Sequence, residues 1–166
     1  MIQGCSLFTV AEVFFKEPTK IHFIREISRK VKLAPTSVRK HIQTLLKEEM
    51  IIKKKGAPFD GFVAHRDSEK FRFYKRAHNF ASLFELKQLI VEELAPQEIR
   101  VFGSYSRGED IEESDIDILI LSKIKRELKY KEIEKKLERK IHCIFVSSFK
   151  ELDKSLQENI LRGWVL

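Results

Sequence analysis

The stretch from residue 98 to residue 121 constrains the fold of this chain more than any other part. It reads EIRVFGSYSRGEDIEESDIDILIL, in which two apolar runs, 99–102 and 118–121, enclose a polar segment. β-branched and aromatic residues dominate both runs, while Gly, Ser and Asp gather between them. This pattern predicts a strand at each end, joined by a short polar connection.

Two carboxylates, Asp115 and Asp117, stand at the start of the second strand. Residues two apart on a strand project from the same face, so the two side chains are expected to point the same way. Their mutual repulsion is about 2–3 kcal/mol at an effective dielectric constant near 20. A cation relieves it, and a hard ion such as Mg²⁺ binds through one or two carboxylates plus substrate phosphates. The alternative is a polar hairpin loop followed by a strand with a solvated acidic face.

A Gly-Ser turn after the first strand is the second half of the expected site. Gly103 lets the backbone approach a ligand closely. Ser104 offers a hydroxyl and nearby backbone N–H groups to an anion. Ser106 and Arg107 lie within reach of the same place. We therefore expect phosphates on this turn and the metal on the aspartate pair.

Gly103-Ser104, Ser106-Arg107-Gly108 and the run 114–117 (SDID) together resemble the signature of the polymerase-beta-type nucleotidyltransferase superfamily, most closely its minimal branch. The resemblance covers roughly residues 80–166. It implies NTP as substrate, Mg²⁺ or alternatively Mn²⁺ as cofactor, and a separately encoded helical protein as a partner. The residues that the resemblance assigns to the site are Asp115 and Asp117 for catalysis and metal binding, and Gly103, Ser104, Arg107 and Ser114 for the nucleotide.

The resemblance fails at one position. Members of the superfamily typically carry a third carboxylate on the strand after the long helix. The corresponding strand here, 141–146 (IHCIFV), contains no acid, and His142 stands where the acid is expected. A neutral histidine can ligate a metal or accept a proton. Equally, the site can bind nucleotide without turning it over.

Charge divides the chain in two. Residues 1–80 contain 17 Lys and Arg against 8 Asp and Glu, a net charge of +9, whereas residues 81–166 carry −2. A basic module of this kind favours a polyanionic partner. The two cysteines make no metal-binding spacing, which fits a reducing cytoplasm. No apolar run approaches the roughly 18 residues of a membrane span, so no membrane partner is expected.

The basic half has the pattern of a winged helix-turn-helix. Helical apolar spacing is found in residues 5–16, 20–31 and 35–49, the third segment beginning at Pro35. Two short strands, 50–55 and 62–66, follow on either side of a Gly- and Pro-containing turn. This stretch resembles winged-helix transcriptional regulators. The alternative is a helical bundle packed against a hairpin, in which the basic side chains are exposed to solvent and bind no partner.

The resemblance implies that the third helix enters the major groove of double-stranded DNA, with the protein binding as a homodimer. The residues expected to contact bases or phosphates are Thr36, Ser37, Arg39, Lys40 and Gln43 on this helix, and Lys53, Lys54 and Lys55 on the wing.

The predicted fold class is α+β, with a winged helix-turn-helix in residues 1–78 and a small mixed-sheet nucleotidyltransferase domain, helices on one face, in residues 79–166. A helix is predicted over 68–77, with a break at Asn79 or Phe80. Two functions remain open. The chain is either a DNA-binding nucleotidyltransferase with an unknown acceptor, or a transcriptional regulator whose nucleotidyltransferase half has lost catalysis and senses nucleotide or binds a partner protein.

Overall fold

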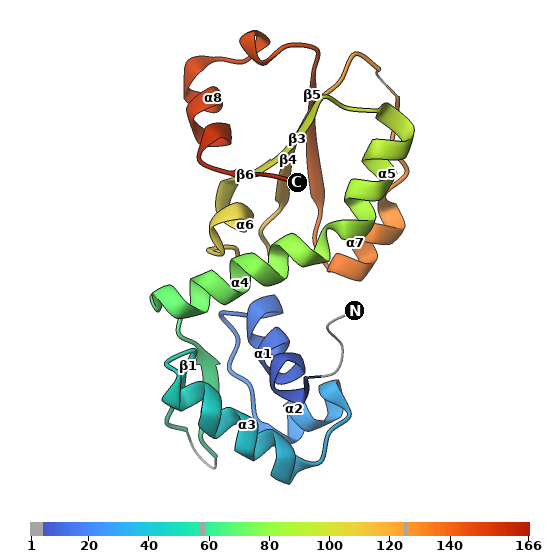
Figure 1. Cartoon of the computed structure of the whole chain (residues 1–166). Helices are drawn as coiled ribbons and strands as arrows, with labels where there is room; N and C mark the ends of the chain where they lie inside the picture. Colours follow the sequence, from blue (N-terminus) through green and yellow to red (C-terminus); the bar gives the residue numbers. More distant parts are fainter. Residues whose placement is uncertain (1–4, 57–58, 125) are drawn as a thin grey trace. The chain divides into compact units, whose positions relative to one another are not determined.

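The computed structural model describes residues 5–56, 59–124 and 126–166, which form two compact units that divide between Lys75 and Arg76 (Figure 1). The boundary predicted after residue 78 lies three residues beyond this division. Ala57 and Pro58 of the predicted wing turn lie outside the described residues.

Three helices open the first unit: α1 (Ser6–Lys16), α2 (Ile24–Val31) and α3 (Pro35–Lys47). Each buries apolar residues at helical spacing, and Val10, Ile27 and Val38 are fully inaccessible to solvent. Full burial of one such side chain contributes about 1.5–3 kcal/mol. One shared core therefore holds the three helices together.

The hairpin that follows consists of β1 (Ile51–Lys54) and β2 (Gly61–Ala64), paired antiparallel with Ile51 opposite Ala64. Ile51, Phe62 and Ala64 join the core of the three helices. The order of elements in this unit is thus three helices and a hairpin.

The second helix is shorter than its apolar pattern predicts. It was expected from residue 20 but begins at Ile24, and Ile21, predicted to face inward, is 47% exposed. The reason is a long-range pairing, since His22 exchanges backbone hydrogen bonds with Phe62 at 2.8 and 2.9 Å. An extended backbone at His22 forms this bridge in place of a helical turn.

Helix α4 (Glu69–Ser82) is continuous where a break at Asn79 or Phe80 was predicted. Its Phe71 belongs to the core of the first unit, while Asn79 is buried in the second. The Asn79 amide donates to the Tyr105 carbonyl and to Asp110 Oδ1, both at 2.9 Å. These bonds satisfy a polar side chain inside the helix, so the chain has no need to turn there.

A four-stranded mixed sheet forms the centre of the second unit, in the order β5-β4-β3-β6. Strand β4 (Ile116–Leu121) is antiparallel to β3 (Glu98–Phe102) and parallel to β5 (Ile141–Val146). The last strand, β6 (Trp164–Val165), pairs antiparallel with β3. Both apolar runs of the central motif are therefore strands, as predicted, and they are neighbours.

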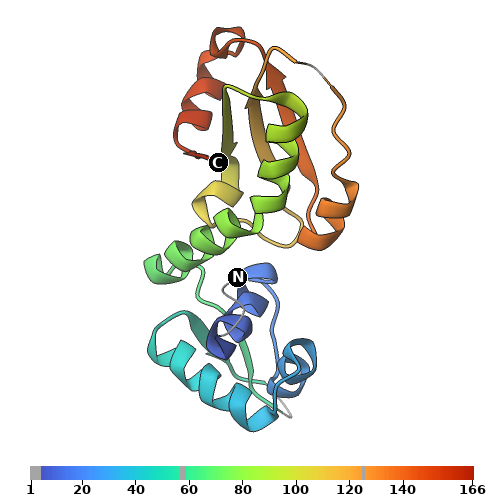
Figure 2. The same ribbon diagram turned by 45° about the vertical axis from the view of Figure 1, so that its right-hand side comes forward.

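Helices cover both faces of this sheet, which corrects the expectation of helices on one face (Figures 1 and 2). On one face Ile99, Val101 and Ile118 pack in a cluster with Leu86 and others from α5 (Phe84–Leu94). On the other face a second cluster centres on Ile160 of α8 (Lys154–Leu161). The second face needs its own helix because its side chains, Phe102, Leu119 and Val146 among them, are apolar as well.

Two further helices are shorter than predicted. The sparse apolar spacing of residues 126–140 predicts a helix, but α7 spans only Lys131–Leu137. The amphipathic pattern of residues 149–161 predicts a single helix, but the structure divides this segment into a 3₁₀ turn, η1 (Phe149–Glu151), and α8, whose start is capped by Asp153. Within the described residues, no helix has the length and apolar character that crossing a membrane requires.

Candidate nucleotide and metal site

The Gly-Ser turn lies directly against the aspartate strand. β3 ends at Phe102, which pairs with Asp117 in the antiparallel register, and the short helix α6 (Gly103–Arg107) begins at the next residue. Gly103 has a φ of +72°, and a Cβ on it would overlap Asp117 Oδ2. Only glycine combines this backbone conformation with so close a carboxylate. The structure thus brings together two of the predicted site residues, Gly103 and Asp117.

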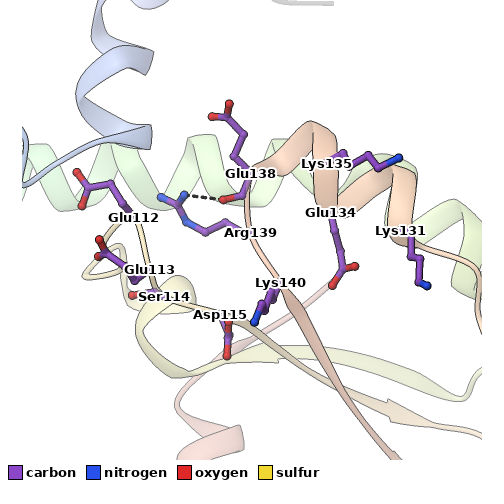
Figure 3. Close-up of a pocket in the computed structure, with 10 residues that line it drawn as sticks. All are labelled: Glu112, Glu113, Ser114, Asp115, Lys131, Glu134, Lys135, Glu138, Arg139 and Lys140. Carbon is purple, nitrogen blue, oxygen red and sulfur yellow. Dashed lines mark hydrogen bonds between the residues drawn. The ribbon is translucent and has the colours of Figure 1, made fainter.

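The second carboxylate, Asp115, is exposed and precedes the first residue of β4. It lines an open cavity of about 760 Å³ (Figure 3). The loop before β4 supplies acids to this cavity, while α7 and the segment after it supply all four cations together with two further glutamates. The lining residues are Glu112, Glu113, Ser114, Asp115, Lys131, Glu134, Lys135, Glu138, Arg139 and Lys140.

Neither Asp117 nor Gly103 lines this cavity, so the two aspartates face different surroundings. Among the described residues, Asp115 and Asp117 do not belong to any group of three His, Cys, Asp or Glu side chains close enough to share an ion. Each offers carboxylate oxygens, and Mg²⁺ takes one or two protein carboxylates and completes its shell with phosphate oxygens and water.

His142 occupies the position beside Asp117 on the next strand. The parallel register of β4 and β5 sets the two residues opposite each other, with His142 Nδ1 3.4 Å from Asp117 Oδ1. The His142 side chain is 63% exposed. The strand predicted to carry the third carboxylate therefore presents an imidazole to the aspartate from an accessible position.

Two other predicted nucleotide-binding residues are engaged locally. The Arg107 guanidinium pairs with Glu109 at 2.7 Å, with both side chains 43% exposed. The Ser114 hydroxyl accepts a hydrogen bond from the Ile111 backbone N–H at 2.9 Å. The pair uses Arg107 Nε, and a guanidinium has further N–H donors, so a phosphate can share Arg107 with Glu109 or displace this surface pair at a cost of about 0–1 kcal/mol.

Ser104 is half-buried in the first turn of α6, next to Gly103. The following residues are anchored from behind, because Ser106 Oγ donates to the Gly103 carbonyl at 2.8 Å and Trp164 Nε1 donates to the Ser106 carbonyl at 2.9 Å. These bonds hold the turn in a fixed position relative to the sheet.

The buried residues that hold this turn in place were not predicted from the sequence. Asn79 and Asp110 are 2% and 1% exposed, and Asn79 bonds both Asp110 and the Tyr105 carbonyl. Tyr105 is held in turn by Ser82, and burial raises the pKa of its hydroxyl to about 12, so it stays neutral. No local pattern marks Asn79, since its partners are 26 and 31 residues away.

The DNA-contact candidates of the first unit are all exposed. Thr36, Ser37, Arg39, Lys40 and Gln43 lie on the solvent side of α3, opposite Val38 and Ile42. Lys53, Lys54 and Lys55 are exposed on and after β1. Adjacent strand residues point to opposite faces, so Lys53 and Lys54 do not share one, and Lys53 pairs with Asp60 at 2.6 Å.

Comparison with known proteins finds a family for one part of the chain. Residues 85–164 match the family model of the nucleotidyltransferase domain. No curated protein matches the chain. A solved structure of a ZitR mutant from Lactococcus lactis is similar at 19% identity with a TM-score of 0.39, a likeness too weak to support an inference. The match covers 51% of this chain and 60% of that one, so this chain spans less than two thirds of its neighbour. The comparisons thus support a nucleotidyltransferase domain in residues 85–164.

Proposed function

We propose that the second unit binds an NTP together with Mg²⁺ and transfers its nucleotidyl group to a hydroxyl acceptor, while the first unit, a winged helix-turn-helix, binds duplex DNA. The observation that carries the enzymatic part is the contact between Gly103 and Asp117. In this proposal the turn receives phosphate and the carboxylate binds the metal, and their closeness supports the arrangement that nucleotidyl transfer requires.

In this proposal Asp115 and Asp117 hold the ion, and Gly103 and Ser104 receive the phosphates, with Arg107 released from Glu109 to join them. When bound, Mg²⁺ neutralises the charge that develops on the phosphates during transfer. Mn²⁺, which also prefers oxygen ligands, is the expected substitute. Ser114 acts indirectly, because its bond to Ile111 shapes the loop that leads to Asp115.

His142 takes the part of the missing carboxylate. The acceptor oxygen attacks the α-phosphorus, the bond from that phosphorus to the pyrophosphate oxygen breaks, and the hydroxyl proton passes to the imidazole. Asp117 Oδ1 lies 3.4 Å from His142 Nδ1, so a proton on Nδ1 is oriented by the carboxylate and Nε2 is left to accept the new one. A positioned base of this kind typically contributes about 10²–10⁴-fold in rate.

The position of His142 beside Asp117 also favours a second candidate function. With a histidine beside Asp117 in place of an acid, the unit retains the ligands for nucleotide and metal but lacks the usual third carboxylate. The chain is then a transcriptional regulator that senses nucleotide without turnover. The two candidates share ligand binding and differ only in release of pyrophosphate.

DNA binding is supported by charge and exposure. The first 80 residues carry a net charge of +9, and the predicted contact residues on α3 and β1 are all accessible. Phosphate contacts from Arg39 and the three lysines position the protein, whereas Lys40 and Gln43 on α3 read the bases. A homodimer would place two such helices about one turn of DNA apart.

The experiment that tests the site is thermal unfolding of the full chain with Mg²⁺ and ATP or GTP. A ligand that binds only the folded chain raises the free energy of unfolding by mass action, by about 2.7 kcal/mol at a hundredfold excess over Kd. The melting temperature rises as a result. The double variant Asp115→Asn, Asp117→Asn should lose this shift. An equal shift in the double variant would show that the nucleotide binds elsewhere.

Pyrophosphate release from the same nucleotides then separates the two candidate functions. Release that requires Asp117 supports the transferase. A melting shift without any release, across a panel of protein, RNA and small-molecule hydroxyl acceptors, supports the sensor.

A further inference from the structure

A second cluster of ligating side chains lies in the first unit, where α1 ends and α2 begins. Glu17 is the residue after α1, His22 lies in the connecting segment, and Glu26 belongs to the first turn of α2. One potential ligand atom from each residue lies within 4.8 Å of the other two. Among the residues that the structure describes, this is the one group of three with such spacing.

The ring of His22 is fully buried, and both of its nitrogens face acceptors. Nε2 lies 3.2 Å from the Glu17 backbone carbonyl, and Nδ1 lies 3.1 Å from Glu26 Oε1. A neutral imidazole carries one N–H and one lone pair. When Nε2 carries the proton, it donates to the Glu17 carbonyl, and the lone pair on Nδ1 then points at Glu26 Oε1. Two electron-rich atoms face each other in this tautomer, and a cation bound by Nδ1 and Glu26 Oε1 makes the arrangement favourable.

A histidine held in this way has the usual environment of a metal ligand, which donates its other ring N–H to a backbone carbonyl and so fixes its tautomer. The ring is further oriented by Phe14, which packs edge-on against it with the centroids 5.3 Å apart. His22 is thus held in one orientation, with Nδ1 toward Glu26 Oε1 and Nε2 3.8 Å from Glu17 Oε2.

The carboxylates are ionised and already attract a cation. Partial burial by itself would raise the pKa of Glu17, but hydrogen bonds from Lys20 and Lys30 outweigh it and lower the pKa to about 2. The pKa of Glu26 is lowered as well, with burial again opposed by His22 and Lys30. The Lys30 ammonium bonds to Glu17 and lies 3.1 Å from Glu26 Oε1, so it bridges the two glutamates.

We propose that Glu17, His22 and Glu26 form a binding site for a divalent transition-metal cation, with Zn²⁺ as the ion that best fits one imidazole and two carboxylates. The ion displaces Lys30, whose side chain is 36% exposed and can move into solvent. Lys20 pairs with Glu17 Oε1, whereas Lys30 pairs with Oε2, so displacing Lys30 leaves the Lys20 pair in place. The Lys20 side chain is 55% exposed. Water completes the coordination at the accessible side.

The location gives the site a structural consequence. His22 pairs through its backbone with Phe62 of β2, so the three ligands connect the end of α1, the start of α2 and the hairpin. A bound ion therefore cross-links the segment that holds the hairpin in place.

Calorimetric titration of the full chain with ZnCl₂, in a buffer that does not chelate, tests the proposal. The parent protein should carry Asp115→Asn and Asp117→Asn, so that the nucleotide site cannot take up the ion. We expect one Zn²⁺ per chain. Glu26→Gln should weaken binding by at least about 10–100-fold, the range seen even for residues that only support a ligand.

Lys30→Met is the more discriminating variant, because it removes the ammonium that competes for both carboxylates. It should bind Zn²⁺ about tenfold more tightly or better. In the parent protein the ion has to displace the Lys30 ammonium from two carboxylates, whereas in Lys30→Met no such cation competes. Lys70→Met is the matched control, as Lys70 is an exposed lysine of the same unit that pairs with Glu48. It should leave the affinity unchanged.

Both test substitutions lie at partly exposed side chains, so the variants are expected to fold, which the melting temperature verifies. His22 is left in place because it is buried in the core. Zn²⁺ affinity that is the same in the parent, Glu26→Gln and Lys30→Met would overturn the proposal, since the ion would then be held elsewhere. Absence of binding in both the parent and Lys30→Met would overturn it equally.

Discussion

Asp117 and His142 lie side by side on the parallel strands β4 and β5, with Asp117 Oδ1 3.4 Å from His142 Nδ1. The other oxygen of the same carboxylate, Oδ2, is next to Gly103. One aspartate therefore lies between the Gly-Ser turn and the histidine that stands where an acid was expected. This relationship determines which substitutions separate binding from chemistry.

His142→Ala should lower pyrophosphate release by about 10²–10⁴-fold, because the proton acceptor is removed. The Mg²⁺–ATP melting shift should persist, since Asp115, Asp117 and the Gly-Ser turn are intact. His65→Ala, a change at a histidine of the other unit, is the control. If the melting shift disappears with the activity, His142 binds the ligand and is not a base.

Gly103→Ala should reduce both stability and nucleotide binding. A non-glycine residue in the left-handed region costs about 1–2 kcal/mol, and the new methyl group displaces Asp117. Gly108→Ala is a matched control, because Gly108 has a φ of +69° at the other end of α6. Chemical unfolding should show a similar backbone cost in both variants, with loss of the Mg²⁺–ATP melting shift only in Gly103→Ala. Equal binding by the two variants would exclude the turn from the site.

Duplex DNA binding by the full chain should depend strongly on salt. For roughly six to eight phosphates neutralised by a dimer, the slope of log K against log salt is about −5 to −7. Replacing Lys53, Lys54 and Lys55 by Ala should flatten this slope and weaken binding on every sequence, as expected for phosphate contacts. A triple Ala change at the exposed residues Lys131, Lys135 and Lys136 of the second unit controls for net charge.

Lys40→Ala and Gln43→Ala should instead alter which duplexes are preferred, because base contacts carry the sequence information. Selection from random duplexes, followed by titration at several salt concentrations, measures both effects. The DNA-binding proposal fails if no duplex is bound at low salt.

Acid should destabilise the first unit through Glu17. Its pKa is about 2 in the folded chain against an ordinary 4.5, so the unfolded chain binds more protons between these values. The resulting stability is fully present above about pH 5 and declines as the pH falls toward 2. Urea unfolding at successive pH values should show this decline, and Glu17→Gln should reduce it.

Glu132→Gln is the control for that series, because Glu132 pairs with Lys135 in a position where it is 78% exposed. Exposed pairs contribute little to stability, so its acid profile should follow that of the unmodified chain. A Glu17→Gln profile that also follows it would contradict the role given to the Glu17 network.

The sequence alone determined the local parts of this protein. Strands were predicted at both ends of the central motif, and β3 and β4 are found there, because β-branched runs interrupted by Gly, Ser and Asp have few other conformations. The absence of an acid on the strand 141–146 was equally visible, and the register places His142 beside Asp117. The apolar spacing also predicted the buried face of α3, with Val38 and Ile42 inside.

Contacts between distant residues decided the rest. Helix α4 passes through Asn79 because Tyr105 and Asp110 satisfy its amide, and α2 starts late because His22 pairs with Phe62. In each case a residue with weak local preference takes the conformation that its partner stabilises. A buried hydrogen bond left unmade costs about 1–3 kcal/mol, more than most helix propensities differ, so tertiary structure prevails at these positions.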